Sequence, residues 1–469
     1  MFGLSIPLIT ILIPIIGSLF IIITDRRNII GIKAVSFWTT LFSLIFSFIP
    51  IFISKRSLNG EYEKMFSNGL FKCEVILDAL SLLFVPIICL ICLLCILWIT
   101  KRKTQKKKSY YISILLFEAL SIGAFYATNI FLIYILIEST IIPLYIIMAQ
   151  KKDSTNKSIF YFLIYTMTSA ILILTAFIII YLNTNTCELR EIYKLGIKSK
   201  SVFWLLALGV GIKLPIWPFY SWLPIVHVKN QTVCSILLAS VVLKFSTLIL
   251  LRIMMPLFSN IIFSHTFLLF VIISISLIFA LSQLIFQDDI KAVFAYFSII
   301  HLNTALLILF NKSGLIYYIF SIMGHSILMP VLFFTANIID RLYGTRSIKT
   351  LASSAIQLPA VRKIISISFF ALIGLPFSWG FVSEILTIQL LAKISYLYII
   401  LPASIAFVSS IFIIFIYNSF LTYKINTSTI DIVEGFYITD IYKKLAFYIP
   451  VTIIFLVGMF PKIIFGVFK

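Results

Sequence analysis

Charged side chains are scarce in this sequence: 12% of the 469 residues are Asp, Glu, Lys or Arg, whereas 61% are hydrophobic. Soluble chains are about 45–50% apolar. The sequence also lacks a Gly-rich phosphate loop, a nucleophile elbow, and a Cys/His metal spacing outside its apolar runs. These absences exclude a soluble enzyme with its own NADH or flavin site. The composition predicts a polytopic membrane protein.

Cysteine is also rare, and three of the six residues fall in one apolar run. Cys89, Cys92 and Cys95 have the spacing i, i+3, i+6, which can indicate ligands of a metal cluster. No fourth ligand flanks them, and cysteines in an apolar helix usually pack as small hydrophobic residues. We therefore predict three buried core thiols and no metal in this chain.

No segment of the chain resembles a targeting signal. The N-terminus opens directly into an apolar run without a basic region, and no Arg-rich amphipathic transit peptide is present. The richness in Ile, Phe, Lys, Asn and Tyr is typical of an AT-rich genome. We expect an organelle-encoded protein that is inserted where it is made. An AT-rich bacterium is the alternative source.

Apolar runs of about 20 residues, the length needed to cross a bilayer, occur throughout the chain. We expect an all-α polytopic membrane protein with a single transmembrane domain over residues 1–469. Within it we expect N-terminal helices 1–3 (1–108), a first repeat (109–256), a second repeat (260–423) and a C-terminal helix (424–469). The fourteen predicted spans are 5–24, 32–54, 75–100, 109–127, 129–149, 158–182, 201–227, 231–256, 260–286, 291–311, 313–339, 360–391, 397–423 and 444–467.

Basic residues gather in short loops, which explains the net charge of +20 without a nucleic-acid partner. Loops after even-numbered spans hold fewer of them and include Glu61, Glu63, Glu188 and Glu191. By the positive-inside rule, loops after odd-numbered spans face the cytoplasm or matrix. The basic residues of the odd-numbered loops are Arg26, Arg27, Lys33, Lys101, Arg102, Lys103, Lys106, Lys107, Lys108, Lys151, Lys152, Lys157, Arg341, Arg346, Lys349, Arg362 and Lys363.

Two predicted spans are interrupted by a Leu-Pro pair: Lys213-Leu-Pro215 in span 7 and Gly374-Leu-Pro376 in span 12. A proline inside a helix lacks the N–H and clashes with the carbonyl four residues earlier. Broken helices at membrane depth are tolerated only inside protein or beside a wet cavity. The breaks lie five spans apart, so we predict two inverted five-helix repeats, helices 4–8 and 9–13. Paired breaks in two halves point to a transport site.

Ionisable side chains occur near the middle of several spans. If isolated, Glu138, Lys213, Lys244 and Glu384 would together cost about 10 kcal/mol, whereas a folded protein is stable by only about 5–15 kcal/mol. They must therefore pair or share water. With two histidines nearby, they predict a lateral proton relay. The candidates for this path are Glu118, Glu138, Lys213, Lys244, His301, His325 and Glu384.

Two other interpretations remain open. Each acid can lock a base and thereby join helices without moving protons. Lys213 can reach the membrane surface beside a simple proline kink, although about ten apolar residues flank it on each side.

Six motifs, taken in order, resemble subunit 4 of NADH:ubiquinone oxidoreductase (respiratory complex I) and its antiporter-like superfamily. The resemblance covers nearly the whole chain and is strongest between residues 115 and 390. Two departures stand out: Lys229-Asn230-Gln231 replaces an acid, a small residue and Pro, and Phe297–Asn303 departs from the usual Ser-Ser-x-x-His-Met-Gly. The six motifs are Leu136–Tyr145, Ile212–Val228, Leu243-Lys244, Gln287–His301, Met323–His325 and Gly374–Glu384.

The resemblance implies roles for these residues. Glu138 would pair with Lys213, Lys244 would be the centre of the relay, and Glu384 would link it to the outer half-channel. His301 and His325 would bridge the two inverted halves through water. Redox energy would come from other subunits, which would hold NADH, FMN, iron–sulfur clusters and ubiquinone, so this chain would carry no cofactor and no redox site.

We therefore expect a proton-translocating membrane-arm subunit of complex I, with other membrane-arm subunits and lipids as partners. The missing targeting signal and the divergent motifs favour the mitochondrial inner membrane over a bacterial plasma membrane. A subunit of a multi-subunit cation/proton antiporter and a purely structural membrane scaffold are the alternative functions.

Overall fold

The computed structural model describes residues 6–53, 61–66, 73–99, 108–150, 156–197, 199–354, 359–421 and 440–466. The chain divides into two compact units, which are described separately. Unit 1 comprises Met1–Lys213, Val241–Ser264 and Phe465–Lys469, and unit 2 comprises Leu214–Ser240 and His265–Ile464. The single domain and its predicted subdivision stay predictions. Much of 424–469 also falls outside the described residues.

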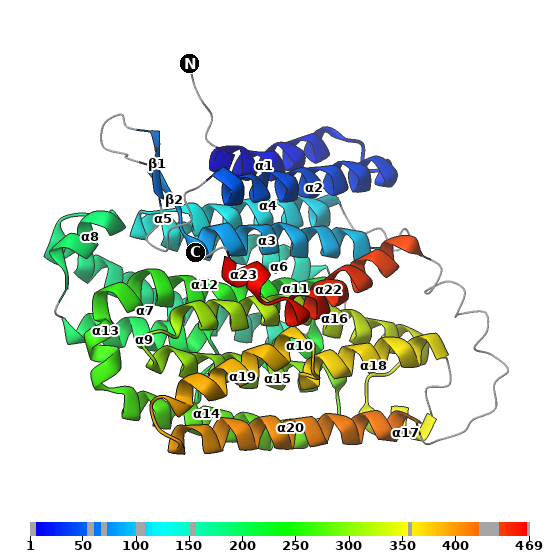
Figure 1. Cartoon of the computed structure of the whole chain (residues 1–469). Helices are drawn as coiled ribbons and strands as arrows, with labels where there is room; N and C mark the ends of the chain where they lie inside the picture. Colours follow the sequence, from blue (N-terminus) through cyan, green and yellow to red (C-terminus); the bar gives the residue numbers. More distant parts are fainter. Residues whose placement is uncertain are drawn as a thin grey trace. The chain divides into compact units, whose positions relative to one another are not determined.

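Unit 1 is built from membrane-length helices and one hairpin (Figure 1). Contacts join α1 to α2 and α4, α2 to α3, and α7 to α9. Its elements are α1 (Ile6–Ile23), α2 (Ile29–Ile53), β1 (Glu61–Phe66), β2 (Cys73–Leu77), α3 (Ala79–Trp98), α4 (Lys108–Tyr126), α5 (Ile130–Ser139), α6 (Ile141–Ala149), α7 (Asn156–Thr184), α8 (Leu189–Leu195), α9 (Lys200–Lys213), α12 (Leu243–Ile249), the π-helix η2 (Leu250–Met254) and α13 (Met255–Ser264).

In unit 2, contacts join α15 to α10, α14 and α16, and α16 to α11, α18, α19 and α22. The π-helix η1 (Leu238–Val242) continues from unit 2 into unit 1. The elements of unit 2 are α10 (Trp222–Lys229), α11 (Thr232–Leu237), α14 (Thr266–Ile285), α15 (Ile290–Leu307), the 3₁₀-helix η3 (Ile308–Phe310), α16 (Leu315–Tyr343), α17 (Ile348–Ser354), α18 (Pro359–Ile373), α19 (Trp379–Ala392), α20 (Leu397–Leu421), α22 (Ile441–Met459) and α23 (Lys462–Phe465).

The helices confirm a helical polytopic membrane fold. Within the described ranges, twelve helical segments are long and apolar enough to span a bilayer. The predicted spans 201–227 and 360–391 are not among the twelve, because each is split into two shorter helices, α9 and α10 or α18 and α19. The two predicted breaks are therefore present. The total of fourteen spans and the inverted repeats stay predictions.

A short antiparallel hairpin, β1 and β2, is the one sheet in the described part of the chain. Glu61 pairs with Leu77, and the register slips between Lys64 and Phe66. The hairpin leads directly into α3, where the Asp78 carboxylate accepts a hydrogen bond from the Ser81 backbone N–H and the Ser81 hydroxyl accepts one from the Asp78 N–H. This reciprocal cap satisfies N–H groups that a helix start otherwise leaves unpaired.

Helix α3 lies in the core of unit 1, because 94% of the residues in its 18-residue apolar stretch are buried. The side chains of Cys89, Cys92 and Cys95 have no exposed surface. The prediction of buried core cysteines is confirmed. The described residues contain no group of three His, Cys, Asp or Glu side chains able to hold a metal ion.

Loop contacts agree with the predicted alternation of sides. The Lys108 ammonium donates to the carbonyl of Thr24 at 2.6 Å, which joins the loops after spans 1 and 3. The Thr128 hydroxyl donates to a Glu188 carboxylate oxygen at 2.8 Å, which joins the loops after spans 4 and 6. Of the predicted loop charges, Lys101, Arg102, Lys103, Lys106, Lys107, Lys151 and Lys152 lie outside the described residues.

Candidate functional site

A buried ion pair in unit 1 joins two helix interruptions. The Lys213 ammonium lies 2.5 Å from Oε1 of Glu138, and the two side chains are 6% and 15% exposed. Oε2 of Glu138 is buried and has no hydrogen-bond partner. Lys213 is the last residue of α9, and Glu138 lies one residue before the end of α5. Both charges therefore sit where regular helix stops.

The prolines explain these interruptions. Pro215 follows Lys213 by two residues, so it cannot donate to the carbonyl of Gly211, and it disfavours helical geometry at Leu214. Pro143 likewise has no N–H to offer the carbonyl of Ser139, where α5 ends. The predicted pairing of Glu138 with Lys213 is thus present in the structure.

Lys244 occupies a different environment in unit 1. It is 1% exposed and lies on α12, which packs against α9, the helix that ends in Lys213. The π-helices η1 and η2 flank α12 on both sides. Such π-segments are rare and occur mostly at functional sites. The sequence carried no signal for them.

Glu118 lies apart from this pair. It has no exposed surface, and the Ser43 hydroxyl contacts its Oε1 while Oε2 has no hydrogen-bond partner. The Cys89 thiol is its other polar neighbour. Glu118 therefore contacts side chains of α2 and α3.

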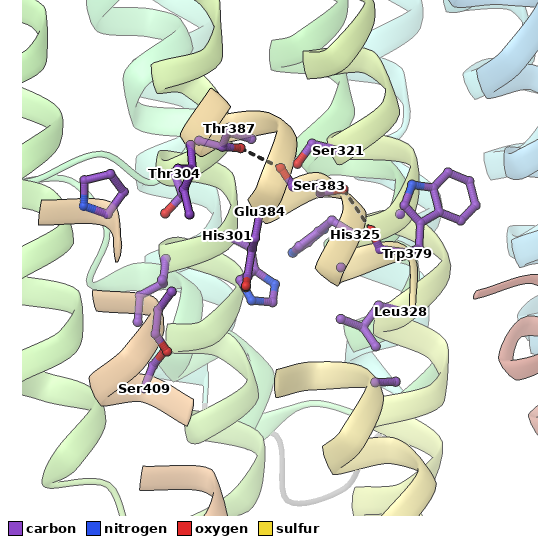
Figure 2. A pocket seen from close by; sticks show the side chains of 18 of the residues that line it. His301, Thr304, Ser321, His325, Leu328, Trp379, Ser383, Glu384, Thr387 and Ser409 are labelled. Carbon is purple, nitrogen blue, oxygen red and sulfur yellow. Dashed lines mark hydrogen bonds between the residues drawn. The ribbon is translucent and has the colours of Figure 1, made fainter. Parts of the chain in front are cut away.

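In unit 2 the structure brings together the three other candidates. His301 of α15, His325 of α16 and Glu384 of α19 line one chamber with Thr304, Ser321, Thr387 and Ser409. The imidazole centroids of His301 and His325 lie 6.3 Å apart, at an interplanar angle of 83°. Figure 2 shows these side chains around the chamber. About 840 Å³ of space is free of protein atoms there, including open solvent at its mouth.

Glu384 has no fixed partner. Among the described residues it makes no hydrogen bond and no ion pair, although it is largely buried. The polar wall of hydroxyls and imidazoles is suited to water, because ordered water needs two to four polar neighbours. A carboxyl group that shares such a chamber with two imidazoles can exchange protons.

A second buried ion pair was missed in the sequence. The Arg252 guanidinium donates to both carboxylate oxygens of Asp78, at 2.7 and 2.8 Å, and to the carbonyls of Phe125 and Ala127. Arg252 stands near the end of predicted span 8 and Asp78 near the start of span 3, so both resembled ordinary flanking charges. The opposite charges of Arg252 and Asp78, each inside a predicted span, were the only sequence signal that could have predicted this pair.

The divergent loop after α10 is fixed by two cations of unit 2. The Lys291 ammonium donates to the Asn230 carbonyl at 2.9 Å, and the Arg346 guanidinium donates to the Val228 carbonyl at 3.2 Å. Cations at a helix C-terminus satisfy its last carbonyls and its dipole. Nearby His227 is fully buried against the Phe333 ring, with ring centroids 4.8 Å apart, and neither ring nitrogen has a partner.

With this geometry established, the chain can be compared with known proteins. Residues 127–413 match the family described as NADH:quinone oxidoreductase/Mrp antiporter, TM. The chain belongs to this family. Both breaks and six of the seven candidate residues lie inside the matched region, and Glu118 lies outside it. The family membership confirms the antiporter-like resemblance.

Individual members of the family align over the whole chain. NADH-quinone oxidoreductase subunit M of Rickettsia prowazekii (strain Madrid E) is 28% identical and aligns with 100% of this chain and 98% of its own length. A chain of respiratory complex I from Thermus thermophilus with bound NADH has a TM-score of 0.81 at 20% identity, covering 99% of this chain and 100% of that one. A chain of the Mrp complex from Dietzia sp. DQ12-45-1b has a TM-score of 0.85 at 17% identity, covering 98% and 95%. The two structures show a shared fold.

Proposed function

We propose that this chain is a proton-translocating membrane-arm subunit of NADH:ubiquinone oxidoreductase. The Lys213–Glu138 pair at a helix break is the observation that carries the proposal. A buried ion pair contributes little to stability compared with well-packed apolar residues, because desolvation offsets the Coulomb attraction. Its retention inside a membrane span therefore favours a role in moving charge.

The relay we propose begins when the pair loosens. If Glu138 moves or gains a proton, Lys213 loses the carboxylate that stabilises its charged form, and it releases its proton more readily. Lys244 then takes the central position, followed by His301 and His325, and Glu384 delivers the proton to the outer side. This chain would perform no redox chemistry and hold no cofactor of its own. Electron transfer among NADH, FMN, iron–sulfur clusters and ubiquinone in other subunits would supply the energy.

The partners in this proposal are other membrane-arm subunits, lipids and protons. The exposed apolar faces of α1, α14 and α20 are suited to lipid or to apolar neighbours. We propose the mitochondrial inner membrane as the location, because the composition is typical of an AT-rich organelle genome. The relative in Rickettsia keeps a bacterial plasma membrane as the alternative.

A cation/proton antiporter subunit is the second candidate function. The similarity to the Mrp chain favours it, since that fold match is as good as the one to complex I. The two functions would use the same buried residues and differ in the energy source. Sodium-dependent proton exchange without NADH would support the antiporter.

The first experiment separates these candidates. Native membranes are solubilised gently, intact complexes are resolved on a native gel and stained for NADH oxidation, and this chain is located by mass spectrometry. We expect it in the large NADH-oxidising band. Its presence only in a smaller complex without NADH activity would overturn the complex I proposal and favour the antiporter.

A variant pair then tests the relay itself. Glu138→Gln should depress proton translocation per NADH oxidised while the assembled complex persists, because the amide cannot stabilise a charged Lys213. Glu191→Gln, a change on the short helix α8 that precedes α9, is the matched control and should pump normally. Full pumping in both Glu138→Gln and Lys213→Met would favour the structural scaffold.

A further inference from the structure

We propose that Trp379 is a positioning residue, which acts with Gly324 and Gly458 to fix the second helix break so that Glu384 faces the chamber. The three residues form a clamp around the break between α18 and α19. This inference rests on the proposed function, because it assigns a role in the same proton path. None of the three is titratable, so each would act through Glu384.

Trp379 anchors the start of α19 to α16. Its side chain is 1% exposed, and the indole N–H donates to the Phe320 carbonyl at 2.9 Å. Its ring also lies against the Phe320 ring, with centroids 5.2 Å apart. Trp379 stands five residues before Glu384 on the same helix. A buried aromatic ring with a satisfied N–H is a rigid support for the helical turn that carries Glu384.

Gly324 provides the space for this ring. A Cβ atom at Gly324 would lie 2.6 Å from Cδ1 of Trp379 and 2.8 Å from its indole nitrogen. An indole cannot bend away as a flexible side chain can, so any larger residue must displace it. Gly324 directly precedes His325. The contact therefore couples the helix that carries one chamber imidazole to the helix that carries the carboxylate.

Gly458 of α22 holds the other side of the break. A Cβ atom there would overlap the backbone of Phe377 and Ser378, including the Phe377 carbonyl oxygen. Phe377 has φ +72°, a left-handed conformation that a non-glycine residue rarely adopts. Strained backbone of this kind persists only where the surroundings hold it, and it clusters at functional sites.

The fixed backbone determines where the carboxylate lies. A Cβ atom at Gly374, which has φ +75°, would lie 3.4 Å from both carboxylate oxygens of Glu384. The Glu384 side chain thus folds back over the break itself. Because it has no hydrogen bond or ion pair among the described residues, packing against the break is what orients it. A shift of the clamp would move this carboxylate relative to His301 and His325 (Figure 2).

The test compares four variants in the assembled complex. Trp379→Phe keeps a ring but loses the N–H, Gly324→Ala pushes on the ring, and Gly324→Ala with Trp379→Leu gives the new methyl group room. Gly123→Ala is the matched control, because its Cβ would meet only the flexible end of Leu136. The measurements are assembly on a native gel and the pH profile of protons translocated per NADH oxidised.

We expect Trp379→Phe to lower pumping about 2–10-fold, the range set by loss of one buried hydrogen bond, and to displace the midpoint of the pH profile. Gly324→Ala should have a larger effect, and the double variant should pump no better than Trp379→Phe, because leucine also lacks the indole N–H. An unchanged pH profile in both single variants would overturn the clamp, provided that Glu384→Gln abolishes pumping. Normal pumping by Glu384→Gln would instead overturn the proposed function. If Gly324→Ala fails to assemble, Trp379→Phe alone decides.

Discussion

The two broken spans end in opposite electrostatic arrangements. At the first break Lys213 closes α9 and is held 2.5 Å from Glu138. Beyond the second break Glu384 lines an open chamber with two imidazoles and has no fixed partner among the described residues. The same Leu-Pro signal in the sequence therefore accompanies one ion-paired charge and one carboxyl group that lines a chamber with two imidazoles.

This difference has a physical basis. Removing two charges from water is costly, and a direct ion pair recovers part of the cost only while both partners stay in place. A single carboxyl group beside water can instead become neutral by binding a proton. We infer that the first break stores a charge pair that must be opened, and that the second presents a group whose proton can be exchanged.

Removing Lys213 should have the largest combined effect on pumping and stability. In Lys213→Met the carboxylate of Glu138 loses its cation, so we expect pumping to fall at least about tenfold, which corresponds to 1.4 kcal/mol in an equilibrium. Breaking a buried pair also destabilises a protein by about 3–5 kcal/mol. Proton translocation and thermal unfolding of the complex measure the two effects.

The double variant Glu138→Gln with Lys213→Met sharpens this test. It leaves no charge unpaired, so stability should return toward the wild-type value while pumping stays low. Recovery of pumping together with stability would show that the pair serves only to join helices.

Replacing Glu384 should uncouple pumping from stability. Glu384→Gln removes the exchangeable proton, and no ion pair is broken, so pumping should be lost with little change in the melting temperature. Ser409→Ala, which changes one hydroxyl of the same chamber, is the control and should reduce pumping only slightly. A large stability loss in Glu384→Gln would mean that the second break resembles the first.

Sequence reasoning found the charged residues and the two breaks because both are costly in a membrane and therefore visible as exceptions. The cost of an isolated charge required that Lys213 and Glu138 pair or share water, and the family resemblance implied that they pair with each other. Sequence reasoning also named all three titratable side chains of the chamber, but not their meeting with Ser409 and Thr304, which depends on how four helices pack. Hydroxyl groups are common in apolar spans and give no signal of their own.

The missed features are those that depend on packing. Arg252 and Asp78 are 174 positions apart and meet only in the folded chain. The π-helices that flank Lys244 contain no proline or glycine from which they could be predicted. Glu118 had the same sequence signal as Glu138, yet its neighbours are a hydroxyl and a thiol, which no periodicity predicts.

Variants of the Arg252–Asp78 pair should show whether a buried ion pair outside the proposed relay affects stability without affecting pumping. It is as buried as the Lys213–Glu138 pair, but Arg252 lies within the π-helix η2 and not at a helix end beside a Leu-Pro pair. Arg252→Met leaves Asp78 without its cation, so we expect about 3–5 kcal/mol of destabilisation and less assembled complex. Pumping per assembled complex should stay unchanged. A fall in specific pumping after correction for assembly would extend the relay to this pair.

Asp288 should give the smallest effect, confined to low pH and to stability. Partial burial alone would raise the pKa of Asp288, but the Ser347 hydroxyl at 2.6 Å and the Lys349 backbone N–H at 3.0 Å hold the pKa below its ordinary value. A lowered pKa stabilises the fold above the unfolded value, about 3.9, and this contribution is lost as the pH falls through the folded pKa. Asp288→Asn should therefore have a lower melting temperature than the wild type at pH 7. The difference between the two melting temperatures should become smaller below about pH 4. Ser347→Ala removes one of the two hydrogen bonds and should show a smaller difference. A difference in melting temperature that stays constant with pH would mean that the Asp288 charge does not contribute to stability. Variants of the chamber residues should not show this pH dependence, since they leave the loop around Asp288 intact.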